Sequence, residues 1–121
     1  MKSILIMCKN SPFGTNSALE AIRLGAGFMG VGEDIDCKIV FSGDAVLTMR
    51  KNLSPSIIGM DGMEDGLEMG DLTDLPIVLI QEDMAQRGMT AEDVIEYEEL
   101  TIVPRTEIPN IMTEFDSAYY M

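Results

Sequence analysis

The chain begins with a short apolar run at residues 4–7, which is followed by a small polar loop at residues 9–15 and then by a helix-like segment. An uninterrupted apolar run of this length is typical of a strand buried on both faces, as in the interior of a parallel sheet. Parallel strands need a crossover between them, and the crossover is usually a helix. The opening segment therefore indicates an α/β fold. It also places its first strand-to-helix loop at the carboxyl edge of the sheet, where such folds bind ligands.

The same alternation continues to the end of the chain. We predict one domain over residues 1–121: a three-layer α/β/α sandwich with about five mainly parallel strands, in the flavodoxin-like topology class. Residues 53–70, where glycines and methionines recur, are predicted to form a short helix or an adaptable loop. The strands are predicted at residues 3–8, 36–41, 75–80, 100–103 and, as an edge strand, 116–121; the helices are predicted at residues 16–30, 45–50, 82–87 and 108–115, with a further helix starting at 90–93.

The overall charge limits the classes of partner. Eight basic and 21 acidic residues give a net charge of −13, which argues against nucleic acid and against anionic membrane surfaces as partners. The chain has no apolar run of about 18 residues that could span a membrane and no signal peptide, so we expect a cytoplasmic protein. It has no histidine, which excludes a Ser-His-Asp triad, a Cys-His pair and a His-ligated zinc site. We expect no metal and no cofactor.

Two cysteines are too few for a disulfide scaffold. Cys8 ends the first predicted strand, where the neighbouring Lys9 can lower its pKa and make it reactive; alternatively, Cys8 is a small buried hydrophobic residue. Cys37 lies at the opposite end of its own strand and is predicted to be in the core. In a parallel pair of strands the two sulfurs would lie far apart, so we predict no disulfide between them.

Polar residues that follow the predicted strands form a candidate site for a small anion, because they share the carboxyl edge of the sheet. The first loop precedes a helix N-terminus, where backbone N–H groups attract anions; the alternative is a capped helix behind a turn. The candidate ligand-binding residues are Ser11, Gly14, Thr15, Ser42, Gly43, Asp44, Gln81 and Glu82.

A magnesium site at this edge is less well supported. Asp44 with Glu82 or Asp83 could bind Mg²⁺, as in phosphotransfer receiver domains. However, Lys9 and Asn10 follow the first strand, where a receiver needs acidic residues.

Two apolar segments are predicted to lie at the surface and to favour assembly. Residues 60–69 are rich in methionine and glycine, and residues 119–121 read Tyr-Tyr-Met. Exposed apolar patches usually form contacts, and closed symmetric oligomers are their common outcome. We therefore expect self-association.

Four short motifs, together with the long first helix, have a pattern seen in a known family. They are residues 11–15 (Ser-Pro-Phe-Gly-Thr), 41–46 (Phe-Ser-Gly-Asp-Ala-Val), 85–89 (Ala-Gln-Arg-Gly-Met) and 115–120 (Phe-Asp-Ser-Ala-Tyr-Tyr). On these residues, and over nearly its whole length, the chain resembles the DsrE/DsrF-like family, and most closely its TusC/DsrF branch. This resemblance implies a DsrEFH-like fold and assembly into a trimer, a hexamer or a mixed hexamer with homologous DsrE-like subunits. It also implies a place in a sulfur relay, in which a cysteine before the Arg-Gly pair carries persulfide sulfur; here that position is Ile80.

Three functions therefore stay open at this point. The first is an accessory or non-catalytic member of an intracellular sulfur-transfer system, because Ile80 cannot carry sulfur. The second is a binding module for a small anionic ligand or nucleotide at the carboxyl edge. The third is sulfur transfer through Cys8.

Overall fold

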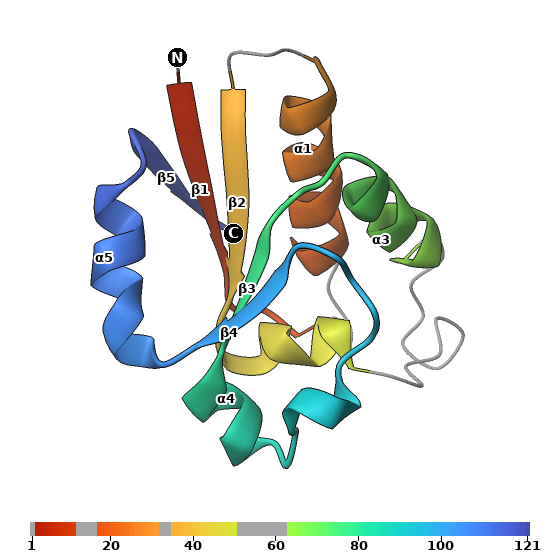
Figure 1. Cartoon of the computed structure of the whole chain (residues 1–121), viewed down its shortest axis with the longest axis vertical. Helices are drawn as coiled ribbons and strands as arrows, with labels where there is room; N and C mark the ends of the chain where they lie inside the picture. Colours follow the sequence, from red (N-terminus) through yellow and green to blue (C-terminus); the bar gives the residue numbers. More distant parts are fainter. Residues whose placement is uncertain (1, 12–16, 32–34, 51–62) are drawn as a thin grey trace.

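The computed structural model describes residues 2–11, 17–31, 35–50 and 63–121. Within this part of the chain, five strands form one sheet in which every neighbouring pair is parallel (Figure 1). This confirms the predicted α/β fold. The strands, in the order β4-β3-β2-β1-β5, are β1 (Lys2–Cys8), β2 (Ile35–Phe41), β3 (Ile77–Ile80), β4 (Leu100–Val103) and β5 (Ser117–Tyr120).

Helices cover the two faces of the sheet unequally and complete the predicted three layers. One face carries two long helices and several short ones, whereas the other is covered by one short helix (Figure 1). The thick layer contains α1 (Ser17–Val31), η1 (a 3-10 helix, Gly43–Met49), α3 (Met63–Leu72), α4 (Gln81–Gln86) and η2 (a single 3-10 turn, Ala91–Asp93). The thin layer is α5 (Ile108–Thr113), which follows the 3-10 turn η3 (Arg105–Glu107).

The sheet reverses its direction of winding at β1. From β1 the chain adds β2, β3 and β4 on one side and then returns to place β5 on the other. The order therefore differs from the 2-1-3-4-5 order of flavodoxin itself. Cys8 pairs with Phe41 of β2, and Met7 pairs with Tyr120 of β5. The carboxyl ends of β1, β2 and β5 therefore meet at one edge, and the gap between β1 and β5 is the topological switch point.

The apolar run in β1 is unbroken because both faces of this strand are buried. Leu5 and Ile6 are both fully buried but belong to different hydrophobic clusters, since successive side chains of a strand point to opposite faces. Ile6 packs in the larger cluster with α1, whereas Leu5 packs with Ile108 of α5. Burial on both faces makes β1 the centre of the domain.

Two short segments differ from their predicted helices. Residues 45–50 were predicted to begin an α-helix, but the structure has the 3-10 helix η1 there, beginning at Gly43. At residues 90–93, the predicted N-cap is present as a capping box of Thr90 and Asp93, but only one 3-10 turn follows. The chain leaves that turn because Val94, which is buried, forms an antiparallel bridge with Arg50.

Residues 63–72 form a regular α-helix, α3, within the segment that was predicted to be a short helix or a loop. The earlier part of that segment, residues 53–62, lies outside the described residues. On α3, Met69 and Leu72 are exposed, which agrees with the predicted apolar surface in this region.

Tyr97 joins the end of α3 to the start of β3. Its phenol hydroxyl donates a hydrogen bond to the Leu75 carbonyl oxygen (2.7 Å), and the Leu75 N–H donates to the Gly70 carbonyl (3.0 Å). A Cβ atom on Gly70 would lie 2.7 Å from the Tyr97 hydroxyl oxygen, so only glycine fits without a shift. Burial, followed by the nearby carboxylates of Asp71, Asp74 and Glu99, raises the pKa of Tyr97, so its hydroxyl stays a donor.

This contact predicts that the effect of Gly70→Ala on the free energy of unfolding depends on whether residue 97 is tyrosine or phenylalanine. In the native chain the new methyl group clashes with the Tyr97 hydroxyl, and overpacking of this kind lowers the free energy of unfolding by about 1–3 kcal/mol. In a Tyr97→Phe background the clash is absent, so the higher helix propensity of alanine should make Gly70→Ala neutral or stabilising by up to about 1 kcal/mol. Urea denaturation of the four proteins measures both effects.

Gly27→Ala on α1 is the control, because a Cβ atom there meets nothing within 4 Å. It should stabilise by about 0.5–1 kcal/mol in both backgrounds. Equal costs for Gly70→Ala with Tyr97 and with Phe at position 97 would show that the hydroxyl is not the constraint.

Candidate functional site

The carboxyl edge of the sheet brings together the candidate residues that follow β2 and β3. Ser42, Gly43 and Asp44 lead from β2 into η1, and Gln81 and Glu82 open α4 directly after β3. Ile39 of β2 and Ile77 of β3 are register partners in the parallel ladder, so these two loops are neighbours, as the sequence predicted. Ser11 is also described, but Gly14 and Thr15 lie outside the described residues.

Asp83 is the centre of this edge, although it was not among the candidate ligand-binding residues. It is only 4% exposed. Its Oδ2 atom accepts a hydrogen bond from the Gly43 N–H (2.8 Å), and its Oδ1 atom pairs with the guanidinium of Arg105. The first contact satisfies a backbone donor at the start of η1. One buried carboxylate therefore ties the ends of β2, β3 and β4 together.

The other carboxylates of the edge also have partners. Asp44 accepts a hydrogen bond from the Arg87 Nε atom (2.8 Å), and Arg87 Nη1 donates to the Asp83 carbonyl (2.9 Å). Glu82 accepts from the backbone N–H of Arg105 (2.9 Å). Among the described residues, no group of three His, Cys, Asp or Glu side chains is placed to hold a metal ion. These acids act as structural acceptors.

A small cavity of about 250 Å³ lies at the topological switch point. Its lining combines the ends of β1 and β5 with the first residue after β2, and it includes the ammonium of Lys9 and the hydroxyls of Ser42 and Tyr120 beside methionine side chains. Its volume is below the roughly 300–1,000 Å³ of typical ligand pockets. It therefore suits a small anion better than a nucleotide. The lining residues are Met7, Lys9, Ser42, Tyr120 and Met121.

Neither cysteine is poised for reaction. Cys8 is fully buried, and burial raises the pKa of its thiol, with a smaller opposing effect from the backbone hydrogen bond with Asn10. The idea that Lys9 lowers this pKa is therefore wrong, because desolvation dominates. Cys37 is buried as predicted, and burial raises the pKa of its thiol to about 11. Both thiols are free, and Cys37 pairs with Ile4 rather than with Cys8 in the β1–β2 register.

Ile80 occupies the position that the family resemblance assigns to a sulfur-carrying cysteine. It is the last residue of β3, is 2% exposed, and precedes the first turn of α4. Its side chain packs with the smaller hydrophobic cluster beneath α5. An aliphatic side chain in this place contributes packing and offers no nucleophile.

The contacts that Asp83 makes with Arg87 and Arg105 were not predicted from the sequence. The sequence held only a weak signal, because Gly43 and Asp83 are 40 residues apart and Asp83 and Arg105 are 22 residues apart. No local pattern pairs residues at such separations. Their mutual contacts come from the parallel register.

These contacts predict that Asp83 contributes more to the free energy of unfolding than Asp44 does. Asp83→Ala leaves the Gly43 N–H without its acceptor and should lower the free energy of unfolding by about 1–3 kcal/mol. Asp44→Ala, the matched control, removes an exposed ion pair and should cost less than about 1 kcal/mol. Amide exchange at Gly43 should accelerate in Asp83→Ala but not in Asp44→Ala. Equal losses of stability in the two variants would contradict this assignment.

Comparison with known proteins gives one family and one fold. A model of the DsrE/DsrF-like family matches residues 2–118. The intracellular sulfur oxidation protein DsrF of Allochromatium vinosum is 26% identical in an alignment that covers 98% of this chain and 86% of that protein.

Two solved structures resemble the chain over 100% of both lengths. The YchN protein from E. coli matches with a TM-score of 0.81 at 19% identity, and a protein of unknown function from Methanobacterium thermoautotrophicum matches with a TM-score of 0.73 at 14% identity. At these identities the likeness shows the fold alone.

No helix in the described part of the chain is long and apolar enough to cross a membrane.

Proposed function

Because the chain belongs to the DsrE/DsrF-like family, we propose that it is an accessory, non-catalytic subunit of an intracellular sulfur-transfer system. Its relative DsrF is an intracellular sulfur oxidation protein, which supports this class of process and an intracellular, cytoplasmic location.

One observation carries the non-catalytic role: the position of the carrier thiol is filled by Ile80, and no substitute thiol is exposed. Persulfide transfer needs a thiolate that can reach a sulfur donor. Cys8 and Cys37 are both buried with raised pKa values, so each is protonated at neutral pH and is shielded from a partner. The chain supplies a fold and surfaces but no sulfur acceptor.

We further propose that the subunit assembles through β5, with itself or with homologous DsrE-like subunits, into a trimer or hexamer. All four residues of β5 are exposed, and β5 is an edge strand of the sheet. Tyr119 and Tyr120 are 52% and 72% exposed, respectively. Exposed aromatic side chains on an unpaired edge are typical of a contact surface.

Native mass spectrometry with and without glutathione persulfide tests both proposals. We expect an oligomer whose mass does not increase by whole sulfur atoms, because no thiolate is available to attack the outer sulfur of the donor and release glutathione. A sulfur gain that disappears in Cys8→Ser would instead assign a carrier role to Cys8.

For the assembly, Tyr119→Asp with Tyr120→Asp should shift the protein to smaller species. Thr106→Asp with Asn110→Asp, which adds the same charge at exposed positions near α5, should not. A strictly monomeric native chain would contradict the assembly proposal.

The cavity at the switch point favours a second candidate function, the binding of a small anion. Lys9 would provide the charge and Ser42 a hydroxyl, whereas the predicted ligand residues Ser11, Gln81 and Glu82 are not among the residues that line this cavity. Saturating phosphate or sulfate should then raise Tm by roughly 5–10 °C, since a ligand of the folded state stabilises it. The rise should be lost in Lys9→Met and kept in Lys38→Met. The absence of any shift with phosphate, sulfate, nucleotides and flavin would remove this candidate.

A further inference from the structure

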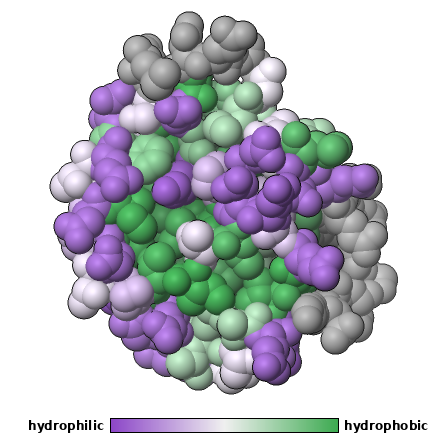
Figure 2. All heavy atoms as spheres, viewed as in Figure 1, coloured by the Kyte–Doolittle hydropathy of each residue, from purple (hydrophilic) through white to green (hydrophobic). Residues whose placement is uncertain are grey.

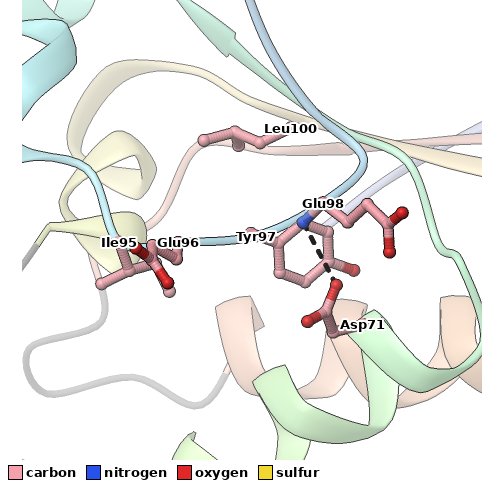
Figure 3. Close-up of a pocket in the computed structure, with 6 residues that line it drawn as sticks. All are labelled: Asp71, Ile95, Glu96, Tyr97, Glu98 and Leu100. Carbon is pink, nitrogen blue, oxygen red and sulfur yellow. Dashed lines mark hydrogen bonds between the residues drawn. The ribbon is translucent and has the colours of Figure 1, made fainter.

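A second hollow lies at the opposite end of the sheet, beside the start of β4. Its volume is about 570 Å³, and it is more than twice as large as the cavity at the switch point. Figure 3 shows side chains from the end of α3 and from the segment before β4 around it. The lining residues are Asp71, Ile95, Glu96, Tyr97, Glu98 and Leu100.

The hollow includes Leu100, the first residue of β4, which is an edge strand of the sheet. β4 has a strand partner, β3, on one side only among the described residues. The Ile77 N–H donates to the Glu99 carbonyl (3.0 Å), so Glu99 faces β3. Because the backbone groups of successive residues alternate in direction along a strand, Thr101 also faces β3, and Ile102 turns its N–H and C=O outward. An extended segment of another chain can pair with these groups.

The surface around this edge is apolar. Figure 2 shows hydrophobic side chains gathered at the centre of the face on which β4 lies, with hydrophilic residues around them. Leu100, Ile102 and Val103 are all half-buried, and Thr101 is exposed. Half-buried aliphatic side chains on both faces of an edge strand provide the apolar contacts that an added strand needs.

The rim of the hollow is acidic, and its charges are not neutralised within the described part of the chain. No lysine or arginine there forms an ion pair with Asp71, Glu96 or Glu98. The contact drawn in Figure 3 is a hydrogen bond from the Glu98 backbone N–H to Asp71 Oδ1 (3.2 Å), which leaves the carboxylate charge in place. A second copy of this chain, with a net charge of −13, would bring acidic groups toward acidic groups.

We propose that the β4 edge and this hollow form a docking surface for an extended, basic segment of a different protein, in which apolar residues alternate with lysine or arginine. Its backbone pairs with Ile102, one apolar side chain enters the hollow against Ile95, Tyr97 and Leu100, and its basic side chains meet Glu96 and Glu98. The alternation follows from the strand period, because successive side chains of an added strand point to opposite faces of the sheet. The surface is separate from β5, and it does not depend on sulfur chemistry or on the proposed assembly.

The test uses the full-length chain labelled with ¹⁵N and two short capped peptides, one alternating lysine and valine and one alternating glutamate and valine. With the lysine peptide we expect chemical-shift changes concentrated at residues 95–103, at least tenfold slower amide exchange at Ile102, and weaker binding at higher salt. With the glutamate peptide we expect at least tenfold weaker binding.

The charge-reversed variant Glu96→Lys with Glu98→Lys should lose at least tenfold in affinity for the lysine peptide. Glu92→Lys with Glu107→Lys, which changes two exposed glutamates elsewhere by the same charge, should bind within about twofold of the native chain. Equal losses in the two variants, equal binding of the two peptides, shift changes centred on β5 or the carboxyl edge, or the absence of binding would overturn the proposal. Changes at residues 95–103 that depend on protein concentration alone would identify a second copy as the occupant and would also overturn it.

Discussion

The pairing of β1 on both of its edges is the constraint on which the rest of the structure depends. β1 is hydrogen-bonded to β2 on one side and to β5 on the other, and its central residues Leu5 and Ile6 are fully buried. A strand in that position must satisfy every backbone donor and acceptor through its neighbours. Since those neighbours run parallel to it, each connection needs a crossover over a face of the sheet. The layers, the reversal of winding and the shared carboxyl edge follow from this arrangement.

The interior beneath the thick helical layer is tightly packed, whereas the two edges of the sheet are available for contacts with other chains. Over the thick layer the packing is close: a Cβ atom on Gly25 of α1 would lie 3.0 Å from both Cδ atoms of Leu75. Cys8 and Cys37 lie in the same cluster, which explains why burial raises the pKa of both thiols. The outer strands are different, because each pairs on one side only in the described chain. The surfaces that support association therefore lie at the two edges of the sheet.

At the carboxyl edge, where α/β proteins usually place their chemistry, the acidic side chains are used for structure. Arg87 binds the Asp44 carboxylate, and the Asp83 carboxylate is bound by Arg105 and by the Gly43 backbone N–H. Both carboxylates therefore act as acceptors that connect the loops after neighbouring strands. Together with Ile80 at the end of β3, this edge agrees with the proposed accessory role, in which the reactive thiol would belong to another chain.

Local patterns in the sequence determined the number and type of the strands, the layered α/β class and the burial of Cys37. They could do so because the spacing of apolar residues along a short segment shows whether one or both of its faces are buried. They also placed Ser42, Gly43, Asp44, Gln81 and Glu82 at one edge, since parallel strands end together. Only the tertiary structure decided the strand order, the Asp83–Arg105 pair, the raised pKa of Cys8 and the acidic hollow beside β4. Each of these depends on which distant segments become neighbours, and that choice is made by the packing of the whole sheet and not by any one stretch of chain.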